Sequence, residues 1–478
     1  MPLGGLSARA AEGPQPGTPA YVQRDLANIA AAYGRQTAPD GQLSPSYLLA
    51  LQGQGGQVPD QLFEQLQSPT RPALTPGQVF PGWNAGNPYR SGWSGKRGLA
   101  VPVSFTNRYG ALLLGTVFAP LPGARDPYTG RVLHGPFPGV VVTTGSVQGS
   151  ERMYWWLAED LAERGYVVLT YDVQGQGRSE SLPHQGPVAD VPFCTGPTGA
   201  GETELCDGVG PQQPSNFVYG TEDAISFFLS TPSRPSRNPA AGSARVSKFN
   251  PLWSLYDASA DRHPSTPGRV SHLGIAGHSL GAAAVSYVQA VDKRVSAVVA
   301  LDKLNSTPGF TALGAFKPVV PSLGVQSEYG FNVYPYVMSH GSSIAPSPGS
   351  PTEGPDPHRE LNAGFVAWQK AHVDSMVIVP RASTHLEYTD ISFALPASRY
   401  GQDVASFYSQ AWFDKYLKHD RTADARLMAT TFHYLEPVDV GVWRPVTLKR
   451  ADQLSFYYCS AYAMRSTGAN RDIAKVGC

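Results

Sequence analysis

Charged side chains are scarce in this chain, since Asp, Glu, Lys and Arg make up only 15% of its 478 residues. The two signs also balance, with 37 acidic residues against 37 lysines and arginines. No basic patch stands out, which argues against a nucleic acid as the partner. Long apolar runs are missing as well. None reaches the 18 or so residues of a membrane span, so we expect no membrane-spanning segment.

Cysteine is rare too, and its four copies fall into two local pairs, Cys194 with Cys206 and Cys459 with Cys478. An even number is compatible with two disulfides and an oxidising compartment, so we expect a secreted or cell-envelope protein. The alternative is four free thiols in a cytoplasmic protein. Residues 8–13 resemble a signal cleavage site, but residues 1–7 lack the charged and apolar regions of a signal peptide, which leaves open a truncated or misassigned start.

Glycine and proline, in contrast, are abundant, with 50 and 43 copies. Aromatic residues still make up 10% of the chain, so this mixture indicates long ordered loops rather than disorder. We predict an N-terminal arm at 1–97, a main domain at 98–431 with insertions at 181–215, 231–269 and 329–357, and a tail at 432–478 packed on the main domain. Insertions of this length are either functional or simple decoration, and we expect at least the first and third to overhang the ends of the strands.

Strands and helices alternate from about residue 98 onward. Two apolar runs, 101–107 and 111–119, flank a short turn with glycine and predict a hairpin. The alternation that follows predicts an α/β fold with a mostly parallel sheet and helices on both faces. Weak helical segments are also expected in the arm at 21–33 and 61–66. The predicted strands are 138–144, 166–171, 270–276, 295–301, 319–325 and 374–379, and the predicted helices are 151–164, 220–230, 282–291 and 405–418.

The sequence Gly277-His278-Ser279-Leu280-Gly281 lies between a predicted strand and a predicted helix. Strand, G-x-S-x-G, helix is the pattern of a nucleophile elbow, a strained turn that exposes the serine hydroxyl at its tip. The alternative is an ordinary glycine-rich turn. On the first interpretation Ser279 is a candidate nucleophile, and it needs a base to take its proton.

The base is expected to be a histidine held by a carboxylate, and both follow the serine along the chain in this architecture. Of the later histidines, only His385 follows a predicted strand closely and precedes the last long helix. Two carboxylates lie where predicted strands end, Glu328 and Asp302. We favour Glu328, because Asp302 precedes Lys303 and so has a surface ion pair as its simpler explanation.

Two main-chain N–H groups are predicted to bind the oxyanion. One belongs to Leu280, directly after the nucleophile, and the other to Ser146 in the loop after the first central strand. Tyr154 and Trp155 are candidates for lining a substrate pocket, although aromatic residues on a helix face are commonly core residues.

Further motifs add a resemblance to a known family. Residues 172–179 resemble the D-x-x-G-x-G-x-S turn of the α/β-hydrolase superfamily, residues 277–281 its elbow, and Thr384-His385 its histidine loop. Residues 411–418 are similar to the final helix of many members. The resemblance spans roughly residues 100–430 and is nearest to bacterial dienelactone-hydrolase-like and cutinase-like esterases. The chain departs from the family pattern in having Thr144-Gly145 where many members have His-Gly, and Glu328 in place of the usual Asp.

The resemblance implies the α/β-hydrolase fold and a serine hydrolase that cleaves carboxylic esters of small or lipid-like substrates through an acyl-enzyme, with Ser279, Glu328 and His385 as its triad. It implies neither a metal nor an organic cofactor. The alternatives are an amidase or peptidase, an acyltransferase with the same triad, and a non-catalytic binding protein on this fold. The sequence gives no prediction of oligomeric state.

Overall fold

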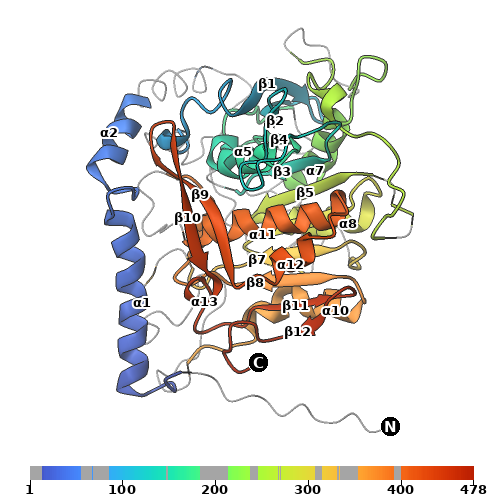
Figure 1. Cartoon of the computed structure of the whole chain (residues 1–478). Coiled ribbons are helices and arrows are strands. Elements are labelled where there is room, and N and C mark those ends of the chain that lie inside the picture. The colour runs from blue at the N-terminus through green and yellow to red at the C-terminus, as the bar shows by residue number, and fades with distance from the viewer. Residues whose placement is uncertain are drawn as a thin grey trace, which may run out of the picture.

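A mixed α/β arrangement around one large sheet forms the described part of the chain (Figure 1). The computed structural model describes residues 13–54, 67, 85–146, 149–183, 214–236, 246–266, 268–269, 271–306, 315–330, 333, 354–391 and 400–478. Within these residues no helix is both long enough and apolar enough to cross a membrane.

The sheet of the described residues has ten strands in the order β1-β2-β4-β3-β5-β6-β7-β8-β11-β12. The six central strands, β4, β3, β5, β6, β7 and β8, all run parallel. Antiparallel pairs complete both edges of the sheet. The strands are β1 (Gly98–Thr106), β2 (Leu112–Pro120), β3 (Gly139–Thr143), β4 (Val167–Tyr171), β5 (Leu273–His278), β6 (Ala297–Leu301), β7 (Ser322–Val325), β8 (Ser375–Ile378), β11 (Ala461–Met464) and β12 (Gly468–Asn470).

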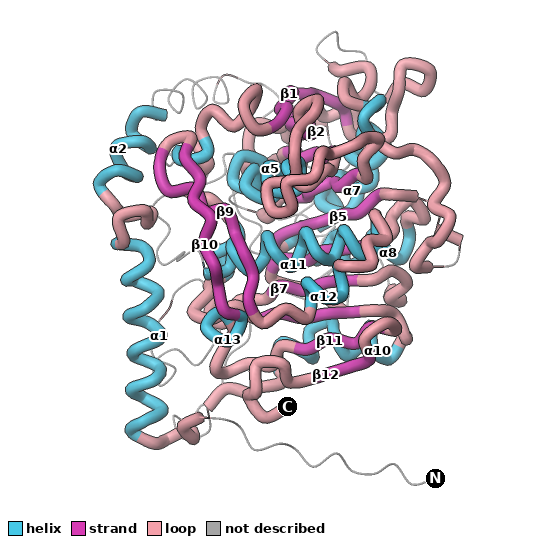
Figure 2. Tube along the Cα trace, in the orientation of Figure 1, coloured by secondary structure: helices cyan, strands magenta, loops and turns pink. Residues whose placement is uncertain are grey.

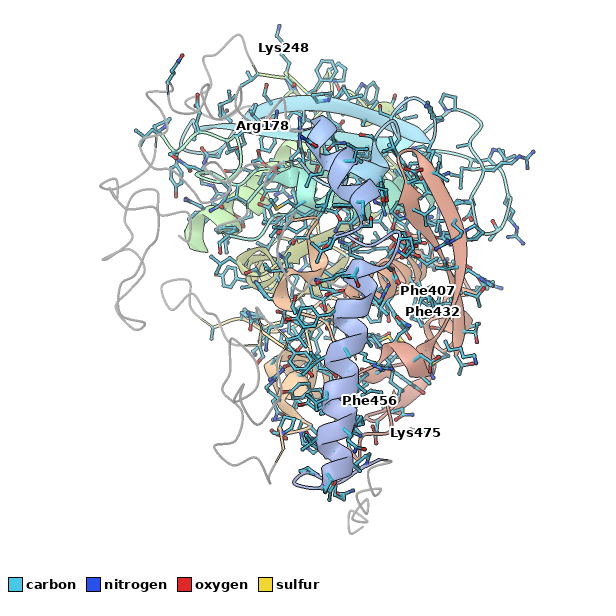
Figure 3. The ribbon with its side chains drawn as sticks, turned by 90° about the vertical axis from the view of Figure 1, so that its left-hand side faces the viewer. Arg178, Lys248, Phe407, Phe432, Phe456 and Lys475 are labelled. Carbon is cyan, nitrogen blue, oxygen red and sulfur yellow. A yellow bond between two sulfur atoms is a disulfide. The ribbon has the colours of Figure 1, made fainter. Side chains whose placement is uncertain are left out.

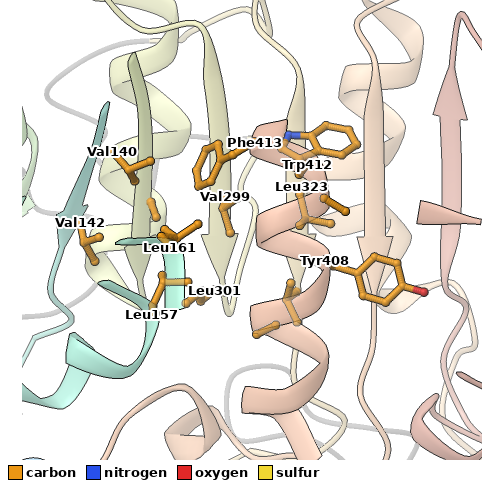
Figure 4. Packing of buried hydrophobic residues seen from close by; sticks show 14 of the residues in the cluster. Val140, Val142, Leu157, Leu161, Val299, Leu301, Leu323, Tyr408, Trp412 and Phe413 are labelled. Atoms are coloured by element: carbon orange, nitrogen blue, oxygen red, sulfur yellow. The ribbon is translucent and has the colours of Figure 1, made fainter. Parts of the chain in front are cut away.

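Helices cover both faces of this sheet, because its central strands are apolar on both sides. Val140 and Val142 of β3 belong to the core shared with α5 (Trp155–Glu163) and α11 (Tyr400–Leu417). Val141, between them, belongs to the opposite core, with α7 (Pro214–Phe228) and α8 (Leu280–Val291). Figure 4 shows the first core, where Leu157, Leu161, Tyr408, Trp412 and Phe413 pack on Val140, Val142, Val299, Leu301 and Leu323.

The N-terminal helices α1 (Pro19–Thr37) and α2 (Pro45–Gln54) stand along one side of the molecule, beside the hairpin of β9 (Thr431–Asp439) and β10 (Val442–Lys449) (Figures 1 and 2). The hairpin packs on α11 through the stacked rings of Phe407 and Phe432, whose centroids are 4.4 Å apart (Figure 3). Residues near the C-terminus hold α1, where the guanidinium of Arg24 lies 5.3 Å from the ring centroid of Phe456.

The C-terminal tail completes one edge of the sheet. β11 pairs antiparallel with β8, and a disulfide joins Cys459, just before β11, to Cys478. The remaining short elements are η1 (Pro88–Arg90), η2 (Glu151–Tyr154), η3 (Trp253–Leu255), η5 (Leu361–Phe365, a π-helix), α10 (Val366–Lys370), η6 (His385–Tyr388), α12 (Ala423–Leu427) and α13 (Arg450–Gln453).

The predicted hairpin, the six predicted central strands and the four predicted helices are confirmed, with ends that shift by a few residues. The helix predicted at 21–33 is confirmed as α1, which is longer. The strands β11 and β12, which extend the central sheet, were missed in the tail. The helix predicted at 61–66, Cys194, Cys206 and most of the insertions at 181–215 and 329–357 lie outside the described residues.

Candidate active site

The turn between β5 and α8 holds Ser279 in a strained backbone conformation, with φ 55° and ψ −121°. This region of φ is costly for a residue with a side chain, and it commonly marks functional sites. Both flanking glycines are required, because main-chain atoms lie where a side chain at either position would begin. A Cβ atom at Gly277 would lie 2.3 Å from the carbonyl oxygen of Gly281, and one at Gly281 would lie 2.4 Å from the carbonyl oxygen of Thr143. The turn therefore has the form of the predicted elbow.

Three side chains from the ends of three parallel strands meet at this turn. Nε2 of His385 lies 3.0 Å from Oγ of Ser279, and its Nδ1 lies 2.5 Å from Oδ2 of Asp302. An ionised carboxylate only accepts hydrogen bonds, so Nδ1 carries the ring proton and the bare Nε2 accepts from the serine hydroxyl. The histidine is thus oriented to take the proton of Ser279.

Asp302 is buried and directly follows β6. Burial opposes its ionisation, but His385, Lys303 and the hydrogen bond from Ser327 outweigh burial and hold the pKa of Asp302 below its usual range. Its second oxygen, Oδ1, accepts from the main-chain N–H of Ser327 at 3.1 Å. The carboxylate is therefore charged at neutral pH and fixed at both oxygens.

The prediction that Glu328 contacts the histidine is wrong, and the alternative Asp302 takes that position. Glu328 also follows its strand, β7, but its side chain points into a different buried network. Oε1 accepts from the hydroxyl of Ser455 at 2.6 Å, and Oε2 accepts from Nδ2 of Asn28 at 2.8 Å. The physical reason is that hydrogen-bond donors from segments near the two ends of the chain hold Glu328, and the position of a residue after a strand does not reveal such distant partners.

Glu328 nevertheless supports the histidine loop. Its Oε2 also accepts from the main-chain N–H of Ala382 at 2.5 Å, three residues before His385. Ala382 has a φ of 51°, a conformation that needs such external support. The two loops are further joined where the N–H of His385 donates to the carbonyl of Gly330 at 2.8 Å. Burial raises the pKa of Glu328, although its three hydrogen-bond donors act in the opposite direction.

The loop after β3 lies against the nucleophile, as predicted for the loop of Ser146. A Cβ atom at Gly145 would lie 3.2 Å from Cβ of Ser279 and 2.8 Å from Nδ1 of His278. Ser146, the next residue, is buried beside this contact. Leu280 is the first residue of α8, where a main-chain N–H has no acceptor within its own helix. Both predicted oxyanion donors thus belong to segments that border Ser279.

Tyr154 does not line an open pocket, which corrects the prediction made for it. It is fully buried, and its hydroxyl lies 2.9 Å from the main-chain nitrogen of Gly145 and 2.8 Å from Nδ1 of His278. Trp155 is half-buried and packs edge-on against Phe118. It lines a cavity of about 180 Å³ to which neither Ser279 nor His385 contributes, so its placement does not support a role in substrate binding.

A larger cavity, of about 670 Å³, is also lined without Ser279, His385 or Asp302. It lies between the start of β3, α11 and β9, and its lining includes Arg164, Asp414 and Phe432. This cavity is therefore separate from the candidate site.

His278 and Asn28 are site residues that sequence reasoning missed. Nε2 of His278 lies 2.8 Å from the main-chain oxygen of His385. Burial is the main cause that lowers the pKa of His278 to about 3, and repulsion from His385 adds to it. The position of His278 inside the elbow motif was a signal that could have found it. Nothing in the local sequence marked Asn28, which lies 300 residues from its partner Glu328.

Within the described residues, one group of side chains has the spacing of metal ligands: His358, Cys459 and Cys478. Both sulfurs of this group are joined in the disulfide, which removes the thiolates that a metal would need. Comparison with known proteins adds no identification, since no protein-family model matches the chain and no curated protein sequence is significantly similar to it.

Proposed function

We propose that this protein is a serine hydrolase that cleaves carboxylic esters through an acyl-enzyme intermediate. The observation that carries the proposal is the convergence of three groups: Ser279 on a strained turn, His385 at 3.0 Å from its hydroxyl, and Asp302 at 2.5 Å from the other ring nitrogen. This is the geometry by which a serine, a poor nucleophile alone, becomes reactive.

The proposed reaction begins when Oγ of Ser279 attacks the ester carbonyl while Nε2 of His385 takes its proton. Asp302 stabilises the imidazolium that forms and holds Nδ1–H in place. The N–H groups of Leu280 and Ser146 bind the oxyanion of the tetrahedral intermediate. The imidazolium then gives its proton to the leaving alcohol. Water, activated by the same histidine, hydrolyses the acyl-serine and restores the enzyme.

The α/β-hydrolase fold is part of this proposal. It is supported by the strand order, by the elbow between the central strand β5 and α8, and by the placement of Asp302 after β6 and His385 after β8. The preference for esters of the small or lipid-like kind cleaved by dienelactone-hydrolase-like and cutinase-like enzymes depends on the sequence resemblance. The disulfide between Cys459 and Cys478 supports a secreted or cell-envelope location.

The test combines covalent labelling with a substrate panel. A fluorophosphonate probe should label the wild type and leave the Ser279→Ala variant unlabelled, with circular dichroism confirming that both are folded. Esters of p-nitrophenol with acyl chains of increasing length, assayed beside p-nitroanilides and with added alcohol acceptors, then separate esterase, amidase and acyltransferase. Folded wild-type protein that neither labels nor hydrolyses any ester would refute the proposal.

A further inference from the structure

A chain of hydrogen bonds connects the three segments of the candidate site beneath Ser279. Its members are the main-chain N–H of Gly145, the hydroxyl of Tyr154, the ring of His278 and the main-chain carbonyl of His385. The three links measure 2.9, 2.8 and 2.8 Å. Tyr154 and His278 are both fully buried, so water does not compete for these groups.

The direction of every hydrogen bond in this series follows from the carbonyl group at one end. A carbonyl oxygen can only accept, so Nε2 of His278 must carry the proton that it donates to His385. A neutral imidazole has one N–H, so Nδ1 of His278 is bare and accepts from the hydroxyl of Tyr154. The oxygen of Tyr154 is then free to accept from the N–H of Gly145. Each donor has one acceptor, and no member is left unsatisfied.

The neutral state of His278 is consistent with its surroundings. Its ring lies 4.7 Å from the ring of His385, measured between centroids, and 6.0 Å from that of Tyr388. A second positive charge beside His385 would be unfavourable at the moment when His385 becomes an imidazolium. Burial and His385 lower the pKa of His278, whereas Asp302 acts in the opposite direction.

Each of the three segments that these hydrogen bonds join carries a group that the proposed reaction uses. Gly145 precedes Ser146, the oxyanion donor, and His278 precedes the nucleophile Ser279. The third contact is to the backbone of His385 itself. The loop of Ser146, the nucleophile and the base would therefore shift relative to one another if one of these hydrogen bonds were removed.

We infer that Tyr154 and His278 act together as positioning residues, which hold the Ser146 loop and the His385 loop at fixed distances from Ser279. The inference rests on the proposed function, because it assigns a role within that reaction. Both side chains are fully buried, so the role assigned to them is to position these loops and not to contact substrate. A displacement of about 1 Å in such an arrangement can cost about 100-fold in rate.

The kinetic test uses Tyr154→Phe, His278→Gln and the double variant. Tyr154→Phe leaves the N–H of Gly145 and Nδ1 of His278 without partners, and the glutamine in His278→Gln keeps a donor for His385 but loses the bond to Tyr154. We expect kcat on a p-nitrophenyl ester to fall by about 10- to 100-fold with KM nearly unchanged. The double variant should be no slower than the slower single variant, because both substitutions interrupt the same series of hydrogen bonds.

Tyr166→Phe is the matched control. Tyr166 is equally buried, and its hydroxyl donates to Asp414 at 2.6 Å, a contact that involves none of the site residues. We expect this variant to lose stability while keeping its kcat. A kcat at the wild-type level in folded Tyr154→Phe, together with active wild-type enzyme, would overturn the inference and leave the proposed function standing.

A spectroscopic test is independent of activity. In wild-type protein with ¹⁵N-labelled histidine, and with His278→Gln used for assignment, His278 should show the neutral form protonated at Nε2 throughout the range from pH 5 to pH 9. Observation of an Nδ1–H form, or of titration near the ordinary value for histidine, contradicts the chain. Wild-type protein that shows the expected form but is not labelled by fluorophosphonate refutes the proposed function alone.

Discussion

The main-chain N–H of Ser327 donates to Oδ1 of Asp302 across 3.1 Å. This bond ties the residue that follows β6 to the segment that follows β7, and it leaves the other carboxylate oxygen of Asp302 for His385. Glu328, the next residue after Ser327, instead accepts hydrogen bonds from Asn28 and Ser455. Two acidic residues near adjacent strand ends thus have different tasks, and substitution should separate them.

Asp302→Asn should lower kcat by about four orders of magnitude, because an amide cannot stabilise the imidazolium and favours the wrong tautomer of His385. Glu328→Gln should lower kcat far less and should instead reduce the free energy of unfolding by about 1–3 kcal/mol, because one oxygen that accepts hydrogen bonds becomes an N–H group facing donors. Steady-state kinetics and urea unfolding of both variants check this. The reverse ranking of the two kcat values would restore Glu328 as the acid.

Gly145→Ala tests the close approach of the oxyanion loop. The added methyl group would lie 2.8 Å from Nδ1 of His278 and 3.2 Å from Cβ of Ser279, so the loop must move. Loss of one oxyanion donor costs about 100- to 1,000-fold in kcat, and we expect a fall in this range with substrate KM less affected. Gly34→Ala in α1 is the control, since its methyl group would meet no atom within 4 Å. Equal kinetics of the two variants would contradict the placement of this loop.

The stability of the protein should depend on pH through His278. Its pKa falls from 6.5 to about 3 on folding, so the unfolded chain binds a proton between these values while the folded chain does not. The stabilisation is therefore complete above about pH 6.5 and is lost as the pH falls toward 3, by about 1 kcal/mol per pH unit. Urea unfolding at several pH values should show a steeper loss in the wild type than in His278→Gln. Parallel curves for the two proteins would argue against a buried neutral histidine.

Asn28→Ala should loosen α1 and the histidine loop together. Asn28 donates to Glu328 and accepts from Nε of Arg381 at 2.8 Å, so its removal takes one hydrogen bond from each of these two charged groups. We expect a loss of about 1–3 kcal/mol in the free energy of unfolding. Hydrogen exchange should accelerate in α1 and around Ala382, but not in the strands β3 and β5. Unchanged exchange around Ala382 would show that α1 is not coupled to the site.

The disulfide between Cys459 and Cys478 closes a loop with a sequence separation of 19 residues, a length for which the loss of a disulfide typically costs about 3 kcal/mol. Cys478→Ser should lower the melting temperature, and a reducing agent should lower that of the wild type but not that of the variant by this route. A peptide containing both cysteines should appear in a digest made without reduction. Its absence would remove the structural argument for an oxidising compartment.

The central fold and two of the three converging side chains could be predicted because they depend on local patterns. Strand periodicity located β3 to β8, and the glycines around Ser279 marked a turn whose steric demands are local. His385 was identified by its place after a strand. The acid was not fixed in this way, because Asp302 and Glu328 both follow strands and the difference between them is a tertiary hydrogen-bond network.

Contacts between distant segments explain the other differences. β11 was missed as a strand because its pairing with β8 lies more than 80 residues away in sequence, and nothing local reveals such a partner. Tyr154 was interpreted as a pocket residue because its aromatic ring is visible in the sequence, whereas the polar partners of its hydroxyl are supplied by Gly145 and His278.

Both ends of the chain meet at Glu328, with Asn28 contributing from α1 and Ser455 from the segment before β11. Through this one carboxylate, the loop that carries His385 is fastened both to α1 and to the segment before β11. A substitution in either of these remote segments should therefore disturb the candidate centre without touching Ser279, His385 or Asp302.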